Sequence, residues 1–448
     1  MSSLVKSDRA RICFAAAKNF ANIADVKSSG REENLQRAID NYLRALEYYT
    51  LKKDKSIFAE VTSLVGISYS NLSEVRDKEK NLGLAIQAFN KVLKVYTFTD
   101  FRLNYAGTQH NLGTAYGKLS EVRDKEINLG LAIQAFNKAL KVNTFVDFPV
   151  DYASTQNNVG NTFSELSGVR DKEKNLGLAI QAYKEVLKVY TLTSFPVDYG
   201  MTQNNLGAAY SKLSRVRDME RNLGSAIHAF NEALKVYTFA SFPMYYAGTQ
   251  SNLGNAYAEL SGVRDMERNF ELAIHAFNEA LKVYTFAGFP MDYAMTQNNL
   301  GTAYAGLSRV RDMERNLTLA IKAFNEALRV RTLFGFPMDY AMTQNDLGTA
   351  YGELSGVKDK KKNLGLAIQA LNEALKVYTR AAFPRQYAMV KSNLGNLFLI
   401  QERVQDFIQY HKEALEIFER EKLTTFAEKE RDILQKFRMA KDIRYKKR

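Results

Sequence analysis

Cysteine and long apolar stretches are scarce in this chain. One cysteine, Cys13, occurs among 448 residues, which excludes an internal disulfide and is typical of a reducing compartment. No stretch of about 18 apolar residues occurs that could cross a bilayer. The N-terminal segment carries charges where a signal peptide would need its apolar stretch. These absences predict a cytoplasmic protein without a membrane partner.

Proline is also rare, and its placement is regular. The chain has six prolines, each 47 residues from the next, which is what a fixed joint between repeated units requires. Eight glycines keep the same spacing, and a strict period of this length indicates a stack of similar supersecondary units. The two columns are Pro149, Pro196, Pro243, Pro290, Pro337 and Pro384, and Gly66, Gly113, Gly160, Gly207, Gly254, Gly301, Gly348 and Gly395.

One unit, residues 195–238, shows what each period builds. Its apolar residues fall at helical spacing in two successive series, which predicts two amphipathic helices. Pro196 suits the first turn of the first helix. Asn222 stands immediately before the second apolar series and is interpreted as an N-cap. Gly207 lies inside the first helix, where glycine costs about 1 kcal/mol relative to alanine, so we expect another backbone to approach it closely.

Several residues of this unit carry a family resemblance. Leu206-Gly207, Tyr210, Ala226, Phe230 and Ala233 follow the order and local spacing of the tetratricopeptide repeat, whose usual period is about 34 residues. The chain resembles a long-period variant of that family. The resemblance implies an all-α, right-handed superhelical solenoid. We expect a tail at 1–11, nine helix-turn-helix repeats at 12–422, and a C-terminal capping helix with a basic tail at 423–448.

Sites for catalysis or for a metal are missing from the sequence. His228 and His275 are one period apart, and stacked helical hairpins would separate them by about 10 Å, too far for a shared metal ion. No Walker loop, dinucleotide-binding glycine motif or nucleophile elbow occurs. We therefore expect no enzymatic activity, no cofactor and no metal.

A row of asparagines is the strongest candidate site. They recur in the middle of the first helix, although asparagine is a poor helix former by about half a kcal/mol, and Asp346 is the one interruption. An amide both donates and accepts, so the row can hold the backbone of an extended peptide. Hydrogen bonds to the adjacent unit explain the row equally well. The predicted peptide-binding residues are Asn111, Asn158, Asn205, Asn252, Asn299 and Asn393.

Basic residues supply the alternative. The net charge is +13, and residues 436–448 hold seven cations against Asp442 alone. A column of cations, one per repeat, also lies in the last turn of the second helix, where positive charge complements the helix dipole. The leading prediction is a scaffold that binds a protein or peptide partner in its groove. The alternative is a nucleic-acid-binding solenoid that uses the tail and this lysine column: Lys94, Lys141, Lys188, Lys235, Lys282, Arg329 and Lys376.

A ladder of charged dipeptides occupies the predicted loop between the two helices of each unit. Its regular alternation of sign predicts pairing between neighbouring loops, which fixes the turn, and exposed pairs of this kind contribute about 0 to 1 kcal/mol each. A ridge that binds a partner is the other interpretation. The ladder consists of Arg76-Asp77, Arg123-Asp124, Arg170-Asp171, Arg217-Asp218, Arg264-Asp265, Arg311-Asp312 and Lys358-Asp359.

Overall fold

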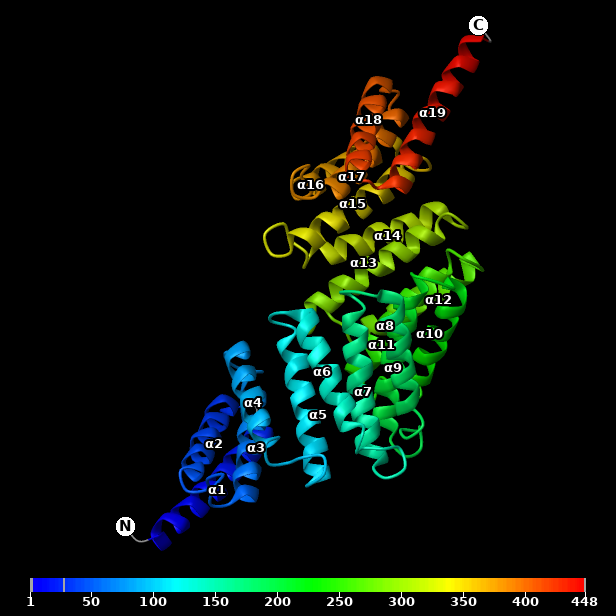
Figure 1. Ribbon diagram of the computed structural model, residues 1–448. Coiled ribbons are helices and arrows are strands. Elements are labelled where there is room, and N and C mark those ends of the chain that lie inside the picture. The colour runs from blue at the N-terminus through cyan, green and yellow to red at the C-terminus, as the bar shows by residue number, and fades with distance from the viewer. Residues whose placement is uncertain (1–2, 27–28, 447–448) are drawn as a thin grey trace. The chain divides into compact units, whose positions relative to one another are not determined.

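The computed structural model describes residues 3–26 and 29–446. These residues form nineteen α-helices and no strand (Figure 1). No helix in this part of the chain combines the length and the apolar character needed to cross a membrane. The helices are α1 (Ser3–Val26), α2 (Arg31–Leu46), α3 (Lys55–Leu72), α4 (Lys78–Val92), α5 (Arg102–Leu119), α6 (Lys125–Ala139), α7 (Pro149–Leu166), α8 (Lys172–Val186), α9 (Pro196–Ser214), α10 (Met219–Leu234), α11 (Pro243–Leu260), α12 (Met266–Leu281), α13 (Pro290–Leu307), α14 (Met313–Leu328), α15 (Pro337–Leu354), α16 (Lys360–Leu375), α17 (Pro384–Ile400), α18 (Val404–Arg420) and α19 (Thr424–Lys446).

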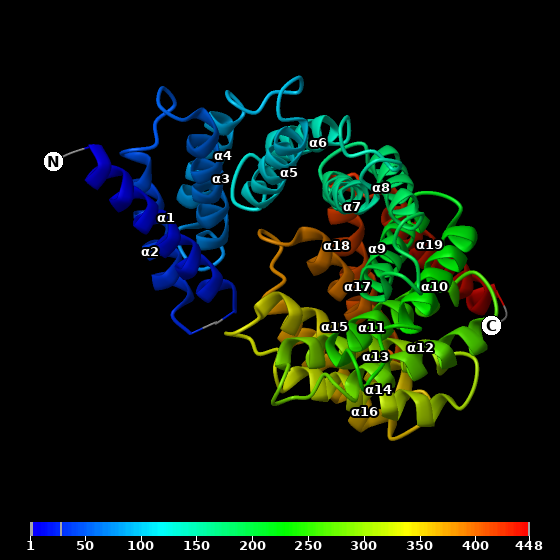
Figure 2. The same ribbon diagram turned by 90° about the horizontal axis from the view of Figure 1, so that it is seen from below.

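Successive helices pack in pairs, as the sequence predicts. The N-terminal unit, residues 1–236, contains five such hairpins, α1/α2 to α9/α10, and Figure 2 shows α1 beside α2 and α3 beside α4. The C-terminal unit, residues 237–448, contains four hairpins, α11/α12 to α17/α18, and the last helix α19. Within each unit the first helices of consecutive hairpins also contact one another, as α5 contacts α7 and α13 contacts α15. We call the surface of these first helices the first-helix face.

The core continues from one hairpin to the next within each unit. In the N-terminal unit, Tyr183 of α8 packs with Leu206 and Leu213 of α9. In the C-terminal unit, Phe324 of α14 packs with Leu347 of α15 in the same way. Each hairpin therefore buries its apolar stripe partly against the following one, as expected of a solenoid.

Proline fixes the joint between hairpins. Six first helices begin at their proline, which occupies the first helical position, where a missing N–H is harmless. Before α9, the Thr191 hydroxyl accepts from the backbone N–H of Ser194 at 3.2 Å, and its carbonyl accepts from that of Phe195 at 3.0 Å. Both backbone N–H groups are thus hydrogen-bonded within the turn, and Pro196 follows as the first residue of the helix.

The loop inside each hairpin corrects the N-cap prediction. Helix α10 begins at Met219, so Asn222 lies within it, buried. Its Nδ2 donates to the carbonyl oxygen of Arg217 at 2.8 Å. Asp218 holds the N-cap position with φ 44° and makes no side-chain cap bond. The asparagine closes the loop from inside the helix, and six equivalents do the same: Asn81, Asn128, Asn175, Asn269, Asn316 and Asn363.

The glycine column makes room for a ring, which corrects the expected backbone contact. A Cβ added at Gly207 would lie 2.6 Å from Cε1 of Phe230, a residue of the second helix in the same hairpin. At Gly348 and Gly395 the neighbouring side chains are Leu371 and His411 instead. The hairpin closes because the side chain of the second helix lies directly against the glycine backbone.

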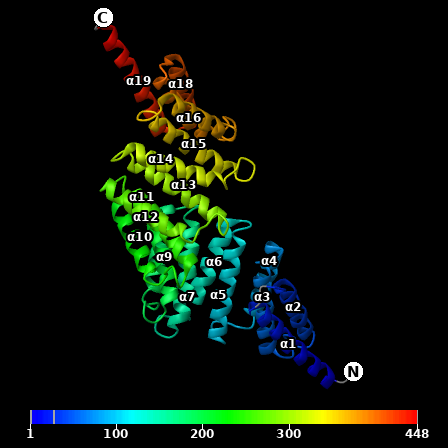
Figure 3. The same cartoon turned by 180° about the vertical axis from the view of Figure 1, so that it is seen from behind.

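The two ends of the solenoid are helical. Helix α1 begins at Ser3, inside the segment predicted as a tail at 1–11, of which residues 1 and 2 lie outside the described part. At the other end α19 packs against α18 (Figure 3). The buried Glu430 carboxylate of α19 lies 2.6 Å from Nδ1 of His411 in α18 and accepts from the Ser392 hydroxyl of α17 at 2.7 Å. Of the predicted basic tail, residues 447 and 448 lie outside the described residues.

Candidate functional site

The asparagine row lies on the first-helix face. Its members are half-buried residues near the middle of their helices, α5, α7, α9, α11, α13 and α17. Asp346 takes the equivalent position in α15 and is also half-buried. Because first helices of consecutive hairpins are in contact within each unit, the row members of one unit are neighbours. The row residues are Asn111, Asn158, Asn205, Asn252, Asn299 and Asn393.

Four members of the row donate a hydrogen bond to the preceding hairpin. Asn205 Nδ2 lies 3.3 Å from Asn161 Oδ1, and Asn299 Nδ2 lies 3.0 Å from Asn255 Oδ1. Asn158 contacts His110 Nε2 at 3.3 Å, and Asn393 donates to Asn345 Oδ1 at 2.9 Å. The row thus stabilises the stacking of hairpins at these positions. An amide has two N–H donors and an oxygen that accepts two bonds, so capacity remains for a ligand.

Asn111 differs from these four. The position 44 residues earlier, which supplies the acceptor for Asn205 and Asn299, holds Ile67 here, and the Asn111 side chain has no hydrogen-bond partner among the described residues. Its side chain lines a cavity of about 440 Å³ that is built from α1, α3 and α5. The Lys18 ammonium and the Glu60 carboxylate form an ion pair of 3.1 Å at this cavity. A free amide therefore stands beside both charges in one recess.

Methionines flank the row in the C-terminal unit. Met295, Met342 and Met389 each lie one helical turn before a row position, and their exposed fractions are 42%, 39% and 36%. Exposed methionine is flexible and polarisable and adapts to varied apolar partners. Sequence reasoning missed this column, although the 47-residue spacing of the three methionines is visible in the sequence.

A buried arginine lies in the connection between α14 and α15, the helix that interrupts the row. Arg331 takes a position that Tyr284 and Tyr378 hold one period before and after, and only 4% of it is exposed. Its Nη1 donates to Thr343 Oγ1 at 3.0 Å, and its Nη2 lies 3.7 Å from Asp339 Oδ1. Burial lowers the pKa of the guanidinium. Sequence reasoning missed Arg331, and the break in the tyrosine column was the available signal.

Asp346 lies near this arginine. Burial raises the pKa of its carboxyl to about 6, against the opposing effect of hydrogen bonds from Asn345 and Asn298. Asn345 Nδ2 is 3.4 Å from its Oδ1. The charged interruption of the row is therefore surrounded mainly by neutral amides.

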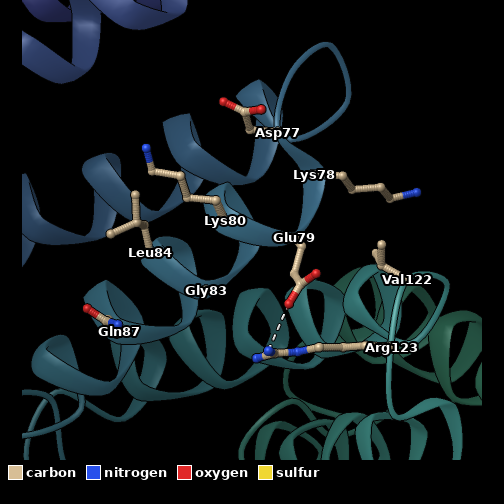
Figure 4. A pocket seen from close by; sticks show the side chains of 9 residues that line it. All are labelled: Asp77, Lys78, Glu79, Lys80, Gly83, Leu84, Gln87, Val122 and Arg123. Carbon is tan, nitrogen blue, oxygen red and sulfur yellow. Dashed lines mark hydrogen bonds and ion pairs between the residues drawn. The ribbon is translucent and has the colours of Figure 1, made fainter.

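The cations of the loop ladder pair between neighbouring hairpins, as predicted, but with glutamates outside the ladder instead of with its aspartates. Arg123 Nη1 lies 2.8 Å from Glu79 Oε1 of the preceding hairpin, and Figure 4 shows this pair across an open recess that Asp77, Lys80 and Val122 also line. The partner is a glutamate two residues after the previous aspartate, and the same pair recurs at Arg170–Glu126 and Arg217–Glu173. These exposed pairs contribute about 0 to 1 kcal/mol each.

The lysine column is largely paired. Lys188 contacts Glu185 at 2.6 Å, and the Tyr152 hydroxyl donates to the same carboxylate at 2.9 Å. The bond from Lys188, together with that from Tyr152, holds the pKa of Glu185 below its ordinary value. Lys94 and Lys141 differ, because lysines occupy the glutamate position there. The paired members are Lys188, Lys235, Lys282, Arg329 and Lys376.

The helix pairs, their 47-residue period and the packing of the signature residues give the chain a tetratricopeptide-like repeat fold. It is similar to the apo form of RapI, with a TM-score of 0.54 and 12% identity over 94% of this chain and 99% of that one. More distant is a signal transduction ATPase with a tetratricopeptide repeat sensor from Pyrococcus horikoshii, with a TM-score of 0.49 and 13% identity over 90% of this chain and 56% of that one. A Rap protein complexed with competence and sporulation factor has a TM-score of 0.40 and 14% identity over 95% of this chain and 100% of that one. No family model and no curated protein matches the sequence.

Proposed function

We propose that the protein is a non-catalytic interaction scaffold whose first-helix face binds an extended peptide or a helix of a protein partner. The observation that carries the proposal is the free amide of Asn111 in a cavity of about 440 Å³ between three first helices. A half-buried amide without an internal partner keeps its donors and its acceptor available to a ligand, and one such hydrogen bond contributes about 0.5 to 1.5 kcal/mol.

The row supplies the rest of the binding surface. A peptide backbone presents one N–H and one carbonyl per residue, and an amide can bond both. Asn205 and Asn299 each use one N–H for the preceding hairpin, which orients the amide and leaves its oxygen for a ligand N–H. A neutral row of this kind supports affinity through the backbone, and selectivity must come from the residues around it.

Nucleic acid is the competing ligand. Five of the seven cations in the lysine column are paired with a glutamate, so the column offers little free charge to phosphates. Lys94 and Lys141, with Lys91 and Lys138, are the exposed exceptions. Nucleic-acid binding would weaken steeply with salt, whereas binding through neutral amides would not.

The test replaces Asn111 with alanine. Peptides selected from a random phage-displayed library on the full chain should bind Asn111→Ala at least about tenfold more weakly, the size of one hydrogen bond. The melting temperature should not fall, because no internal bond is lost. Asn231→Ala, an exposed change on the second helix α10, is the matched control and should leave affinity unchanged.

Two results would contradict the proposal. If a peptide binds the wild type and Asn111→Ala with equal affinity, the Asn111 amide does not contribute to peptide binding. Tight binding of single-stranded RNA that collapses between about 50 and 200 mM salt, without any peptide binding, would favour the nucleic-acid alternative.

A further inference from the structure

Asp346 is the one charged member of an otherwise neutral row. It lies in α15, between Asn299 in α13 and Asn393 in α17, which occupy the same position one period before and after. The other amides can bond a backbone without regard to side chains. A carboxylate at this position adds a preference, because it repels an anion and attracts a cation.

The carboxylate has no ion-pair partner. Among the described residues no cationic nitrogen lies within 4.0 Å of it. Asn298 and Asn345 donate to it. Arg331, a cation that lowers its pKa without contact, donates to Thr343 and lies beside Asp339. The titratable groups around Asp346 are thus Arg331, Asp339 and Tyr378, and none neutralises it by contact.

The remaining charge is costly inside the protein. Burial raises the pKa of Asp346 to about 6, so at neutral pH the side chain is ionised against a desolvation penalty. A cation supplied by a ligand would offset that penalty. The raised pKa and the missing ion pair both indicate that Asp346 would be stabilised by a cation from a ligand.

An apolar contact accompanies the charge. Met342 precedes Asp346 by one turn of α15 and is 39% exposed, and Met389 of α17 is 36% exposed. Lysine and arginine carry an aliphatic stem below the charged head. An exposed methionine beside a carboxylate suits both parts of such a side chain.

We propose that Asp346 is a specificity-determining residue that selects a peptide segment bearing a lysine or arginine, with the basic head on the carboxylate and the aliphatic stem on Met342. This inference rests on the proposed function and names the class of peptide that the C-terminal unit takes. In this proposal the basic side chain of the peptide contacts Asp346 directly. A general attraction between charged surfaces would need no such contact.

The experiment is a double-mutant cycle with a synthetic peptide. Peptides are first selected from a random phage-displayed library on the full chain. One lysine peptide and its norleucine analogue are then measured by calorimetry on the wild type and on Asp346→Asn. Replacing lysine should weaken binding about tenfold on the wild type and less than about twofold on Asp346→Asn, a coupling of about 1.4 kcal/mol.

A control and a pH series sharpen the result. Asp339→Asn removes the same charge from the same helix at a more exposed side chain, and the preference for lysine should persist in it. Affinity of the wild type for the lysine peptide should rise between pH 5 and pH 7, because ionisation of Asp346 strengthens the pair, and Asp346→Asn should lose that rise.

The outcomes that overturn the inference are distinct. Selected peptides without a basic residue, or a lysine effect of equal size in Asp346→Asn, remove the role of Asp346 while peptide binding stands. Equal loss of both peptides in Asp346→Asn shows a purely structural role, and loss of the preference in Asp339→Asn shows long-range charge. A library that yields no binding peptide overturns both the inference and the proposed function.

Discussion

At the scale of the residue, glycine decides how closely the two helices of a hairpin approach. The Phe230 ring occupies the space that a Cβ at Gly207 would need, and Phe89, Phe136, Phe277 and Phe324 stand in the same relation to their glycines. Glycine in a helix is unfavourable by propensity, so the packing of the ring must stabilise the hairpin by more than this cost.

Two alanine substitutions separate propensity from packing. Gly207→Ala should lower the free energy of unfolding by up to about 2 kcal/mol, because overpacking costs about 1 to 3 kcal/mol and the propensity gain returns only about 1 kcal/mol. Gly224→Ala in α10 should raise stability by up to about 1 kcal/mol, since nothing lies within 4 Å of the added Cβ. Urea denaturation followed by circular dichroism measures both, and a stabilising Gly207→Ala would contradict the packing described for the ring.

At the scale of the element, the second helix of each hairpin begins with an unusual turn. Asp218 adopts the left-handed conformation, as do its equivalents from Asp77 to Asp359. A non-glycine residue in this region costs about 1 kcal/mol or more. The buried Asn222 side chain compensates by donating to the Arg217 carbonyl, which joins the loop to the helix that follows it.

The position of Asn222 can be tested by replacing it with aspartate. An N-cap tolerates either residue equally, whereas the structure needs a donor, and a carboxylate would face the Arg217 carbonyl oxygen. Asn222→Asp should therefore destabilise the protein by about 1 to 3 kcal/mol. Asn231→Asp, on the exposed side of the same helix, should stay within about 0.5 kcal/mol of the wild type. Equal melting curves for Asn222→Asp and the wild type would support the N-cap interpretation instead.

At the scale of the whole molecule, stability depends on contacts between consecutive hairpins. Core residues of a second helix pack on the next first helix, and charged pairs such as Arg123–Glu79 join neighbouring loops. Since the hairpins of one unit meet their neighbours with similar residues, a hairpin within a unit can be removed if the junction is preserved.

Deletion of one period tests this dependence within the N-terminal unit. Removing residues 113–159 joins Leu112 to Gly160 and restores the Leu-Gly pair, so the shortened protein should stay folded with the same helicity per residue. Removing residues 113–136 joins unlike segments and should abolish cooperative melting. Circular dichroism measures both. If the two shortened proteins melt with the same cooperativity, the protein does not depend on intact hairpins and their contacts for its stability.

Much of the fold could be predicted from the sequence, because it is carried by local patterns and one fixed spacing. The helical period, the proline at the start of the first helix and the opposite charges in the loops each depend on residues close in the chain or one period apart. In a stack of hairpins, one period is also the distance between spatial neighbours. Pairing of the loop ladder was predictable for this reason.

The tertiary structure alone decided which atoms meet. The left-handed backbone at Asp218 moves the start of α10 back and places Asn222 inside it, and no apolar pattern encodes the sign of φ. The packing of Phe230 determines that a ring covers Gly207. Asn111 lacks the amide acceptor that Asn205 and Asn299 have, because Ile67 stands 44 residues before it. Arg331 donates to Thr343, and Asp346 is bonded by the amides of Asn298 and Asn345 instead of by a cation. The sequence determined a repeating scaffold, and the packing of its irregular residues determined where that scaffold offers a free amide and a free charge.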